Sequence, residues 1–424
     1  MNSHSGDSTK AVSSWRGAIR GNVLMIGLVS LFTDFSSEMI FPLLPVFLAG
    51  LLGSGRAAIY VGLMAGVAEA TASLLKIFSG RISDVIGRRK ILVVVGYGIS
   101  TMCRPLMATA TAGWHVVALR FGDRVGKGLR TSPRDALISD SAGPNVRGLA
   151  FSFHRVMDHT GAVLGPLAAV GILYVFLGEL LWCGSTADPA AREMSALRWL
   201  FWIALLPGLA AMAVLIRVRE IRPRPQSDRT HPHDRFNTPK RLPRRFYAFV
   251  GIATIFALGN SSDLFLVFYG KVRFGLGLGQ LIGLWVALHV SKIVFSLPGG
   301  ILSDRLGRRP IIIAGWAVYA LVYLGMATAS QPQQFWALIV IYGLYYGMTE
   351  GAAKALVADC VPGESRGTAY GLYHGAVGIA ALPASLMFGV FWRFIGPQWA
   401  FGIGAALAAA AVGLMVLLSA TKKR

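Results

Sequence analysis

Charged residues are scarce in this sequence. Of its 424 residues, 14% are Asp, Glu, Lys or Arg, whereas an ordinary soluble domain carries about 25%. Apolar residues make up 54% of the chain, and the mean hydropathy is +0.57. So few charges cannot cover the surface of a water-soluble protein of this length, and a soluble enzyme is therefore excluded.

Cysteine is also rare, and the common catalytic motifs are missing. Cys103, Cys183 and Cys360 form no spaced set, which argues against a disulfide framework or a zinc site. The sequence has no phosphate-binding Walker loop, no HExxH pair and no nucleophile elbow. We therefore expect no enzymatic activity, no cofactor, no metal site and no direct coupling to ATP.

What the sequence has in excess is positive charge between long apolar runs. The formal net charge is +21, which by itself would suggest nucleic-acid binding. The basic residues lie in short connectors between the apolar runs, as membrane topology requires, so we expect a lipid bilayer and no nucleic acid as partner. The polar first twenty residues and the long run after them predict no cleaved signal peptide.

Each apolar run is long enough to cross a bilayer, which takes about 20 residues of helix. The expected fold is an all-α membrane protein with twelve transmembrane helices in two pseudo-symmetric six-helix bundles. The expected spans are 22–48, 57–79, 90–111, 114–139, 148–177, 196–216, 246–269, 280–302, 310–329, 335–358, 367–394 and 398–420.

The arginines and lysines also predict the orientation. They cluster in one alternating set of connectors and in residues 217–245, which are rich in proline. By the positive-inside rule, both termini and this linker face the cytoplasm of a multi-pass protein in the cytoplasmic (inner) membrane. The expected segments are a cytoplasmic amino-terminal segment 1–21, an amino-terminal bundle 22–216, a basic linker 217–245 and a carboxyl-terminal bundle 246–424. His231 and His233 in the linker are interpreted as solvated residues and not as metal ligands.

The two halves repeat each other. Gly80-Arg-Ile-Ser-Asp84-Val-Ile-Gly-Arg-Arg89 recurs 220 residues later as Gly300-Ile-Leu-Ser-Asp-Arg-Leu-Gly-Arg-Arg309. A second pair, Ala-Leu-Ile-Ser-Asp140 with a following Arg-Gly, recurs after 219 residues at Asp359. Repeated six-helix halves are typical of transporters, whose substrate site lies near the membrane midplane between the repeats.

The doubled G-x-x-x-D-x-x-G-R-R signature resembles that of the major facilitator superfamily, and the resemblance covers nearly the whole chain. It implies alternating access by two halves that rock against each other. It also implies a conformational latch, with topology determination alone as the other interpretation. The expected latch residues are Gly80, Asp84, Arg88, Arg89, Gly300, Asp304, Arg308 and Arg309.

Two further motifs resemble elements of this superfamily. Arg124-Val-Gly-Lys-Gly128 is similar to its R-x-x-x-G element, although Lys127 replaces the usual glutamine. Gly161-Ala-Val-Leu-Gly165-Pro166 looks like the G-x-x-x-G-P element of proton-coupled exporters, but two alanines follow where that element has glycines. Pro166 removes a helical hydrogen bond and is expected to kink the helix, while Gly161 and Gly165 serve close packing.

Many ionisable residues fall inside the expected spans. Such a group costs about 2.5–3.5 kcal/mol at the bilayer centre, so it should face a cavity and have a function there. A lone histidine such as His289 is also compatible with simple packing, and Glu350 and Lys354 are spaced to pair with each other. The expected substrate-cavity residues are Glu69, Arg104, Asp158, Asp263, His289, Lys292, Tyr346, Glu350 and Tyr373.

Proton coupling needs a carboxylate that titrates near neutral pH. Asp34 and Glu38 lie four residues apart on one helical face, and Asp34 and Arg124 fall at similar depth, about 18 and 15 Å along their helices. Desolvation raises the pKa of a carboxyl group and a nearby arginine lowers it. Our hypothesis is that Asp34 is the proton site, Glu38 relays the proton and Arg124 modulates the affinity.

Three functions remain open at this point. The leading one is a monomeric secondary transporter that exports a small organic compound in exchange for protons. The alternative is proton-coupled import or export of a compact anionic or metal-complexed solute, with anion contacts at Arg104, Arg130, Arg134 and Lys292. A receptor or scaffold that transports nothing is a third possibility, but a scaffold has no need of costly buried charges.

Overall fold

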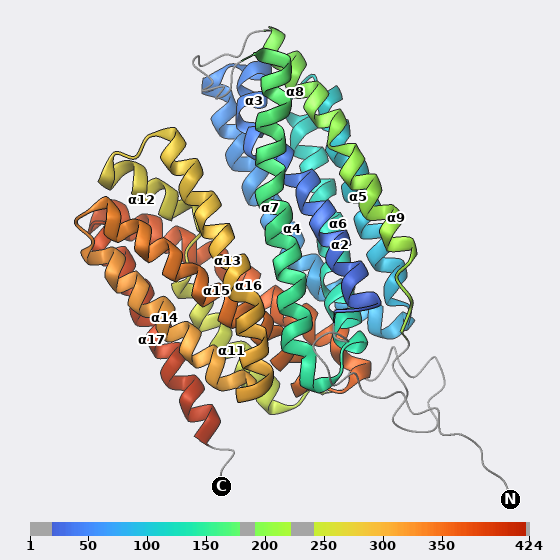
Figure 1. Ribbon diagram of the computed structural model, residues 1–424, viewed down its shortest axis with the longest axis vertical. Coiled ribbons are helices and arrows are strands. Elements are labelled where there is room, and N and C mark those ends of the chain that lie inside the picture. The colour runs from blue at the N-terminus through green and yellow to red at the C-terminus, as the bar shows by residue number, and fades with distance from the viewer. Residues whose placement is uncertain (1–18, 179–190, 222–240, 421–424) are drawn as a thin grey trace, which may run out of the picture.

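The computed structural model describes residues 19–178, 191–221 and 241–420, and their regular secondary structure is helical (Figure 1). The amino half contains α2 (Asn22–Ile40), η1 (Phe41–Leu43), α3 (Leu44–Leu52), α4 (Ser54–Ile86), α5 (Arg89–Leu106), η2 (Met107–Thr109), α6 (Gly113–Ser141), η3 (Pro144–Val146), α7 (Arg147–Leu177), α8 (Ala191–Ile203) and α9 (Leu205–Ile216). The carboxyl half contains α11 (Arg244–Gly259), α12 (Leu264–Phe274), α13 (Leu278–Leu306), α14 (Arg308–Thr328), α15 (Pro332–Cys360), η4 (Gly363–Ser365), α16 (Arg366–Phe394) and α17 (Pro397–Ala420).

These helices form twelve long rods in the described part of the chain. Nine segments are long and apolar enough to cross a membrane. The other three rods, α4, α6 and α15, have 33, 29 and 29 residues and are more polar. The all-helical architecture predicted from the hydropathy pattern is confirmed.

Three of the twelve rods are interrupted, which the hydropathy pattern does not reveal. The first breaks at η1, where Pro42 has no N–H group to continue the helix. The sixth is divided between α8 and α9. The seventh breaks between α11 and α12 at residues 260–263, where Asn260 adopts an extended conformation. Asparagine and serine favour such breaks because their side chains compete for backbone hydrogen bonds.

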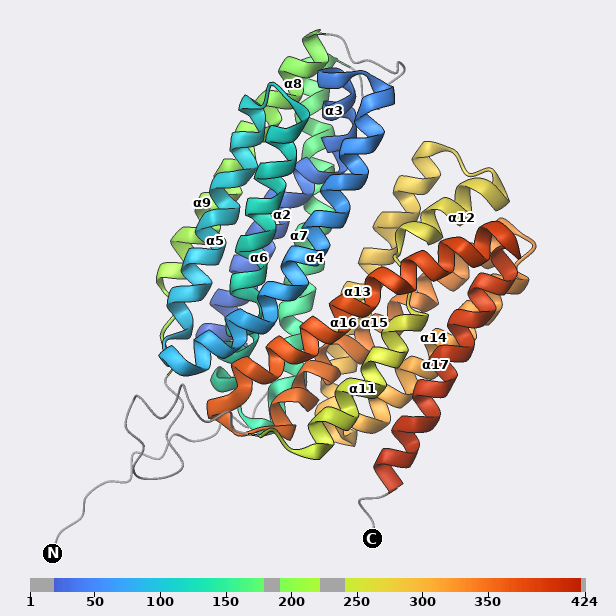
Figure 2. The same ribbon diagram turned by 180° about the vertical axis from the view of Figure 1, so that it is seen from behind.

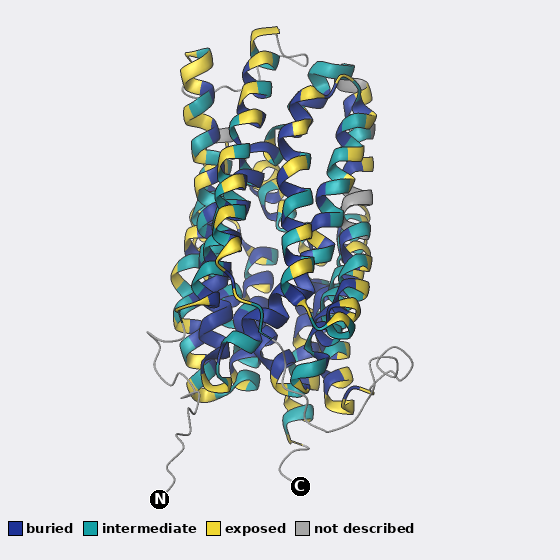
Figure 3. Ribbon diagram, turned by 90° about the vertical axis from the view of Figure 1, so that its right-hand side faces the viewer, coloured by how far each residue is buried: buried dark blue, intermediate teal, exposed yellow. Residues whose placement is uncertain are grey.

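The two halves touch at one end and separate at the other. Figures 1 and 2 show the amino and carboxyl halves meeting at the end where both chain termini leave the bundle, here called the base, and diverging toward the opposite end, the top. Figure 3 shows that buried residues concentrate toward the base. The molecule is therefore closed at the base and splayed at the top.

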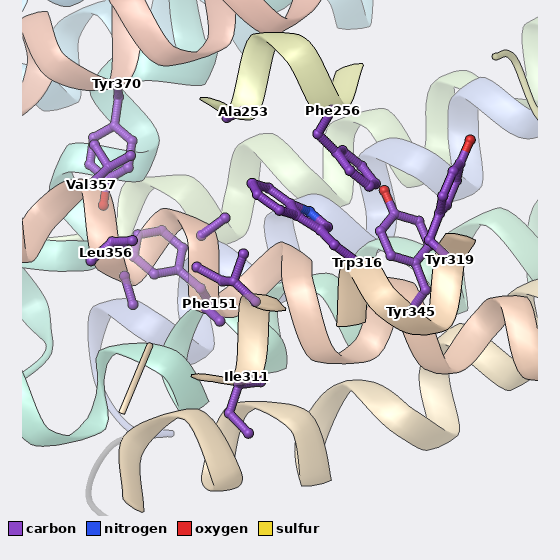
Figure 4. Packing of buried hydrophobic residues seen from close by; sticks show 14 of the residues in the cluster. Phe151, Ala253, Phe256, Ile311, Trp316, Tyr319, Tyr345, Leu356, Val357 and Tyr370 are labelled. Carbon is purple, nitrogen blue, oxygen red and sulfur yellow. The ribbon is translucent and has the colours of Figure 1, made fainter. Parts of the chain in front are cut away.

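The apolar core follows the same pattern. One cluster joins both halves at the base, where the rings of Phe151 (α7) and Tyr370 (α16) lie 5.8 Å apart, with Leu356 and Val357 in the same cluster (Figure 4). A separate cluster around Phe47 and residues 196–204 contains amino-half residues. Apolar burial therefore holds the halves together where they meet at the base.

Candidate functional site

Two aspartates of the repeated motif bond to the opposite half. Asp84 at the end of α4 accepts hydrogen bonds from the backbone N–H groups of residues 367–368, at 3.0 and 2.6 Å. Asp304 in α13 accepts equivalent bonds from residues 148–149, at 3.0 and 2.8 Å. The first N–H groups of a helix have no intrahelical partner and carry positive partial charge. Each motif aspartate therefore caps the first turn of a helix in the other half.

Two arginines at the starts of α7 and α16 cross the same boundary. Arg147 lies 2.6 Å from the carboxylate of Asp359, and Arg366 lies 2.5 Å from that of Asp140. Residues 140 and 359 occupy equivalent positions of the second repeat. The base is thus closed by a pseudo-symmetric set of caps and ion pairs, which we call the base seam.

The doubled arginines of the motif take different roles in the two halves. Arg89 is 1% exposed and contacts Asp84 and Asp140 of its own half, while donating a hydrogen bond to a carbonyl of η4 at 2.9 Å. Arg308 takes the corresponding place in the carboxyl half and donates to a carbonyl of η3 at 2.7 Å. Arg88 is exposed and Arg309 bonds within its own half. Two of the four expected latch arginines therefore lie outside the seam.

The seam requires backbone contact between helices at the motif glycines. A Cβ atom at Gly300 would lie 2.6 Å from the hydroxyl of Ser152 and 2.9 Å from the carbonyl of Gly148. A Cβ atom at Gly80 would collide with the backbone of residues 367–371. Glycine is therefore needed at both positions for the halves to meet this closely.

A buried ionic cluster lies above the seam. The carboxylate of Asp135 in α6 is fully buried and lies 2.8 Å from Lys354 of α15 and 2.8 Å from His374 of α16. Arg134 is 2.9 Å from the same carboxylate. One carboxylate of the amino half thus holds two groups of the carboxyl half.

One turn higher, Glu350 of α15 reaches α7. Its carboxylate lies 3.5 Å from Arg155 and 3.4 Å from His159, whose ring is 5.5 Å from that of His289. Arg155 also pairs with Asp158 at 2.7 Å. His159 follows the first residue of α7 by twelve positions, or ~18 Å of helix. The contacts between the halves thus reach the middle of the bundle.

Asp34 of α2 lies beside Asp158. The two carboxyl groups are hydrogen-bonded neighbours, and Asp158 also accepts a bond from Ser30 at 2.6 Å. A hydrogen bond between two carboxyl groups requires a proton on one of them. The cation that acts electrostatically on Asp34 is Lys127, and the structure does not bring Arg124 to Asp34 as the sequence suggested.

The glycines of the G-x-x-x-G-P element lie against this acidic stretch of α2. A Cβ atom at Gly161 would be 3.1 Å from the Cβ of Asp34, and one at Gly165 would be 2.8 Å from the Cβ of Glu38. Pro166 lies inside α7. The element therefore sets the distance between α7 and the helix face that carries Asp34 and Glu38.

A cluster of arginines lies above Asp34 in the amino half. Asp123 is shared by Arg104 at 3.3 Å, Arg120 at 3.2 Å and Arg124 at 3.9 Å. The guanidinium of Arg120 lies 3.4 Å from the ring centre of Phe41 in η1. Three guanidinium groups thus share one short-range carboxylate partner.

The carboxyl half presents a carboxylate ringed by tyrosines. Asp263 lies 2.9 Å from the ammonium of Lys292 and accepts hydrogen bonds from the hydroxyls of Tyr342 and Tyr346, each at 3.0 Å. Lys292 also lies 3.7 Å from the ring centre of Tyr346. Tyr373 stacks on a phenylalanine ring of α11 at 5.9 Å.

The remaining expected residues are distributed as follows. Glu69 and Cys183 lie outside the described side chains. Glu350 and Lys354, which the spacing allowed to pair, bond instead to partners in the amino half. Arg130 donates to the hydroxyl of Ser100 at 2.5 Å and lies over the ring of Tyr97.

Several residues of these networks were not proposed from the sequence. Arg120 has a visible signal, because it lies four residues before Arg124 on the same helix face. Asp135 has none, because its partners come from α15 and α16, more than 200 residues away.

Comparison with known proteins identifies the family of the fold. The Major Facilitator Superfamily model matches residues 26–290 and 278–424. An uncharacterized MFS-type transporter of Methanocaldococcus jannaschii, MJ1317, is 32% identical over 403 residues, covering 93% of this chain and 94% of that protein.

Two further likenesses are more limited. The multidrug resistance protein MdtH of Edwardsiella ictaluri is 30% identical over 182 residues, which is 43% of each chain. The crystal structure of the human organic anion transporter MFSD10 superposes with a TM-score of 0.74 over 95% of this chain and 99% of that one, at 15% identity. At that identity the likeness shows the fold alone.

Proposed function

The chain belongs to the major facilitator superfamily, and from that premise we propose that it exports a small organic compound in exchange for protons. Members of this family are transporters and not enzymes, and this chain is a multi-pass membrane protein. The observation that carries the proposal is the hydrogen-bonded pair Asp34–Asp158, which is linked through Arg155 to Glu350 of the other half.

We take the base of the molecule as its cytoplasmic side. The basic connectors and both termini favour this orientation in the inner membrane by the positive-inside rule. The state described above is then outward-open. Access from the cytoplasm requires the base seam to open while the tops of the halves approach each other.

Proton binding is coupled to this movement through Arg155. When Asp158 is ionised, it shares the guanidinium of Arg155 with Glu350. A proton on the Asp34–Asp158 pair reduces the negative charge that competes for Arg155. The balance between the contact inside the amino half and the contact between the halves then changes with protonation, which makes proton binding and rocking interdependent.

Export is favoured over import by two limited observations. The G-x-x-x-G-P element packs directly on the stretch that carries Asp34 and Glu38, and one partial relative is a multidrug resistance protein. Proton-coupled movement of a compact anionic solute in either direction remains the second candidate, because the arginine cluster around Asp123 favours a negatively charged ligand.

The test uses purified full-length protein in proteoliposomes with a pH-sensitive dye inside. A thermal-shift screen over organic acids, bases and neutral compounds supplies the solutes. We expect a solute that stabilises the protein to move protons across the membrane, and Asp34→Asn to abolish that proton movement. If stabilising solutes move without protons, or if Asp34→Asn couples normally, the proposal is wrong.

A further inference from the structure

A line of basic side chains runs along one face of α6. Arg120, Arg124 and Lys127 are spaced by four and three residues, so they lie on the same side of the helix. Arg120 precedes the last residue of α6 by 21 positions, which is ~31 Å of helix. The line therefore lies above the His159–Glu350 contact, in the part of the molecule where the halves diverge (Figure 2).

This region holds more positive than negative charge. Glu38 interacts electrostatically with Lys127, Arg120, Arg124 and Arg104. The cations of the region are Arg104, Arg120, Arg124, Lys127 and Arg130, and its carboxyl groups are Asp34, Glu38 and Asp123. Even with every carboxyl group ionised, the cations exceed the anions by two.

Such an excess is unfavourable inside a membrane. An ion in a low-dielectric region needs a partner of opposite charge, and removing that partner is strongly destabilising. Arg130 has a hydroxyl, a carbonyl and an aromatic ring as its described contacts. The Nε of Arg124 is buried without a hydrogen-bond partner in the described part of the chain. The cluster is therefore built for one more anion than the protein supplies.

We infer that Arg120 and Arg124 bind the negatively charged group of the transported compound, which is thus an organic anion. Two guanidinium groups side by side suit a carboxylate or phosphate, whose oxygens accept paired N–H bonds. The inference rests on the proposed transport function and specifies its substrate class. Outward movement of an anion in exchange for an inward proton transfers two positive charges inward, so the inside-negative membrane potential drives the exchange.

The test measures thermal unfolding of the full-length protein in lipid-free detergent. The probes are phosphate, benzoate, phenylphosphate and, as a neutral isostere, benzamide, all at constant pH and ionic strength. We expect at least one anion to raise the Tm in a saturable way and benzamide to have no effect. Arg120→Gln and Arg124→Gln should weaken that anion's apparent affinity by tenfold or more.

A matched control is Arg393→Gln, because Arg393 is an exposed arginine of the carboxyl half that lies 5.6 Å from the ring of Phe394. This control should bind like the wild type. We further expect Arg124→Gln without ligand to be at least as stable as the wild type, because it removes an unbalanced charge. The inference is overturned if no anion in the panel gives a shift that depends on Arg120 or Arg124, or if benzamide shifts the Tm equally.

These measurements are made without a proton gradient, so they separate the inference from the proposed function. A protein that binds anions through Arg124 but moves no protons refutes the coupling and keeps the anion site. A protein that moves protons with a neutral or cationic solute and ignores anions refutes the anion site and keeps the coupling.

Discussion

Asp34 of α2 and Asp158 of α7 are hydrogen-bonded through their carboxyl groups in the middle of the amino half. Their other contacts differ. Asp158 pairs with Arg155 and accepts a bond from Ser30, whereas the described charged neighbours of Asp34 are Glu38, Lys127 and Asp158 itself. The two carboxyl groups therefore have separable roles, which mutation can distinguish.

Replacing each member of this pair should have a different effect on stability. Asp34→Asn keeps a hydrogen-bonding side chain and breaks no described ion pair, so we expect a change in unfolding free energy within about 1 kcal/mol. Asp158→Asn removes the carboxylate 2.7 Å from Arg155 and should cost about 1–3 kcal/mol, below the 3–5 kcal/mol of a fully buried pair. Thermal unfolding in detergent compares them; equal losses would contradict separate roles.

The two capping aspartates should be equivalent. Asp84→Asn and Asp304→Asn each leave two helix N–H groups with a weaker acceptor, a loss of about 1–2 kcal/mol that exists only while the base is closed. Such a loss shifts the equilibrium toward the base-open state by ~5–30-fold. Solvent labelling of single cysteines placed along the seam measures this shift. A large effect from one variant and none from the other would refute the pseudo-symmetric arrangement.

The two crossing arginines should be unequal. The carboxylate of Asp140 is 5% exposed, whereas that of Asp359 is 30% exposed. Arg366→Gln therefore leaves a more buried charge with a lost partner than Arg147→Gln does, and buried pairs cost more to break. We expect Arg366→Gln to open the base more than Arg147→Gln in the same labelling assay. The reverse order would show that burial does not determine the strength of these pairs.

Glycine at the seam should be essential for closure. A Cβ atom at Gly367 would lie 2.5 Å from the carbonyl of Gly80 and 2.7 Å from the carboxylate of Asp84, so Gly367→Ala should hold the base open. The matched control is Gly171→Ala in α7, where a Cβ atom meets nothing within 4 Å. There alanine should be neutral or stabilising by up to about 1 kcal/mol. Equal behaviour of the two variants in cysteine labelling would contradict the close-packed seam.

Much of the fold could be predicted because hydropathy and repetition are properties of the chain itself. Apolar runs of about 20 residues predict spanning helices directly. The breaks at Pro42 and at residues 260–263 are harder to predict, because a proline or a short polar stretch inside a span is compatible with a continuous helix whose neighbours satisfy the freed backbone groups.

Individual side-chain partners were predicted less well. Asp84 and Asp304 were expected at an inter-helix cap because the motif repeats, and a carboxylate near a helix start has few other uses. The pairing of Glu350 with Lys354 was expected from helical spacing, but the competing partners Arg155 and Asp135 come from distant segments. One sequence without its three-dimensional neighbours does not contain that competition.

The most direct test of the account measures the distance between the tops of the two halves as a function of pH. Thr111→Cys and Gln398→Cys, both exposed at helix starts near the top, carry spin labels in a protein whose native cysteines are replaced, reconstituted in lipid nanodiscs. The account predicts a long and a short distance whose ratio changes between pH 5.5 and 8.5, and a ratio that barely changes in Asp34→Asn. A single distance at every pH, or the same pH response in Asp34→Asn as in the wild type, would contradict it.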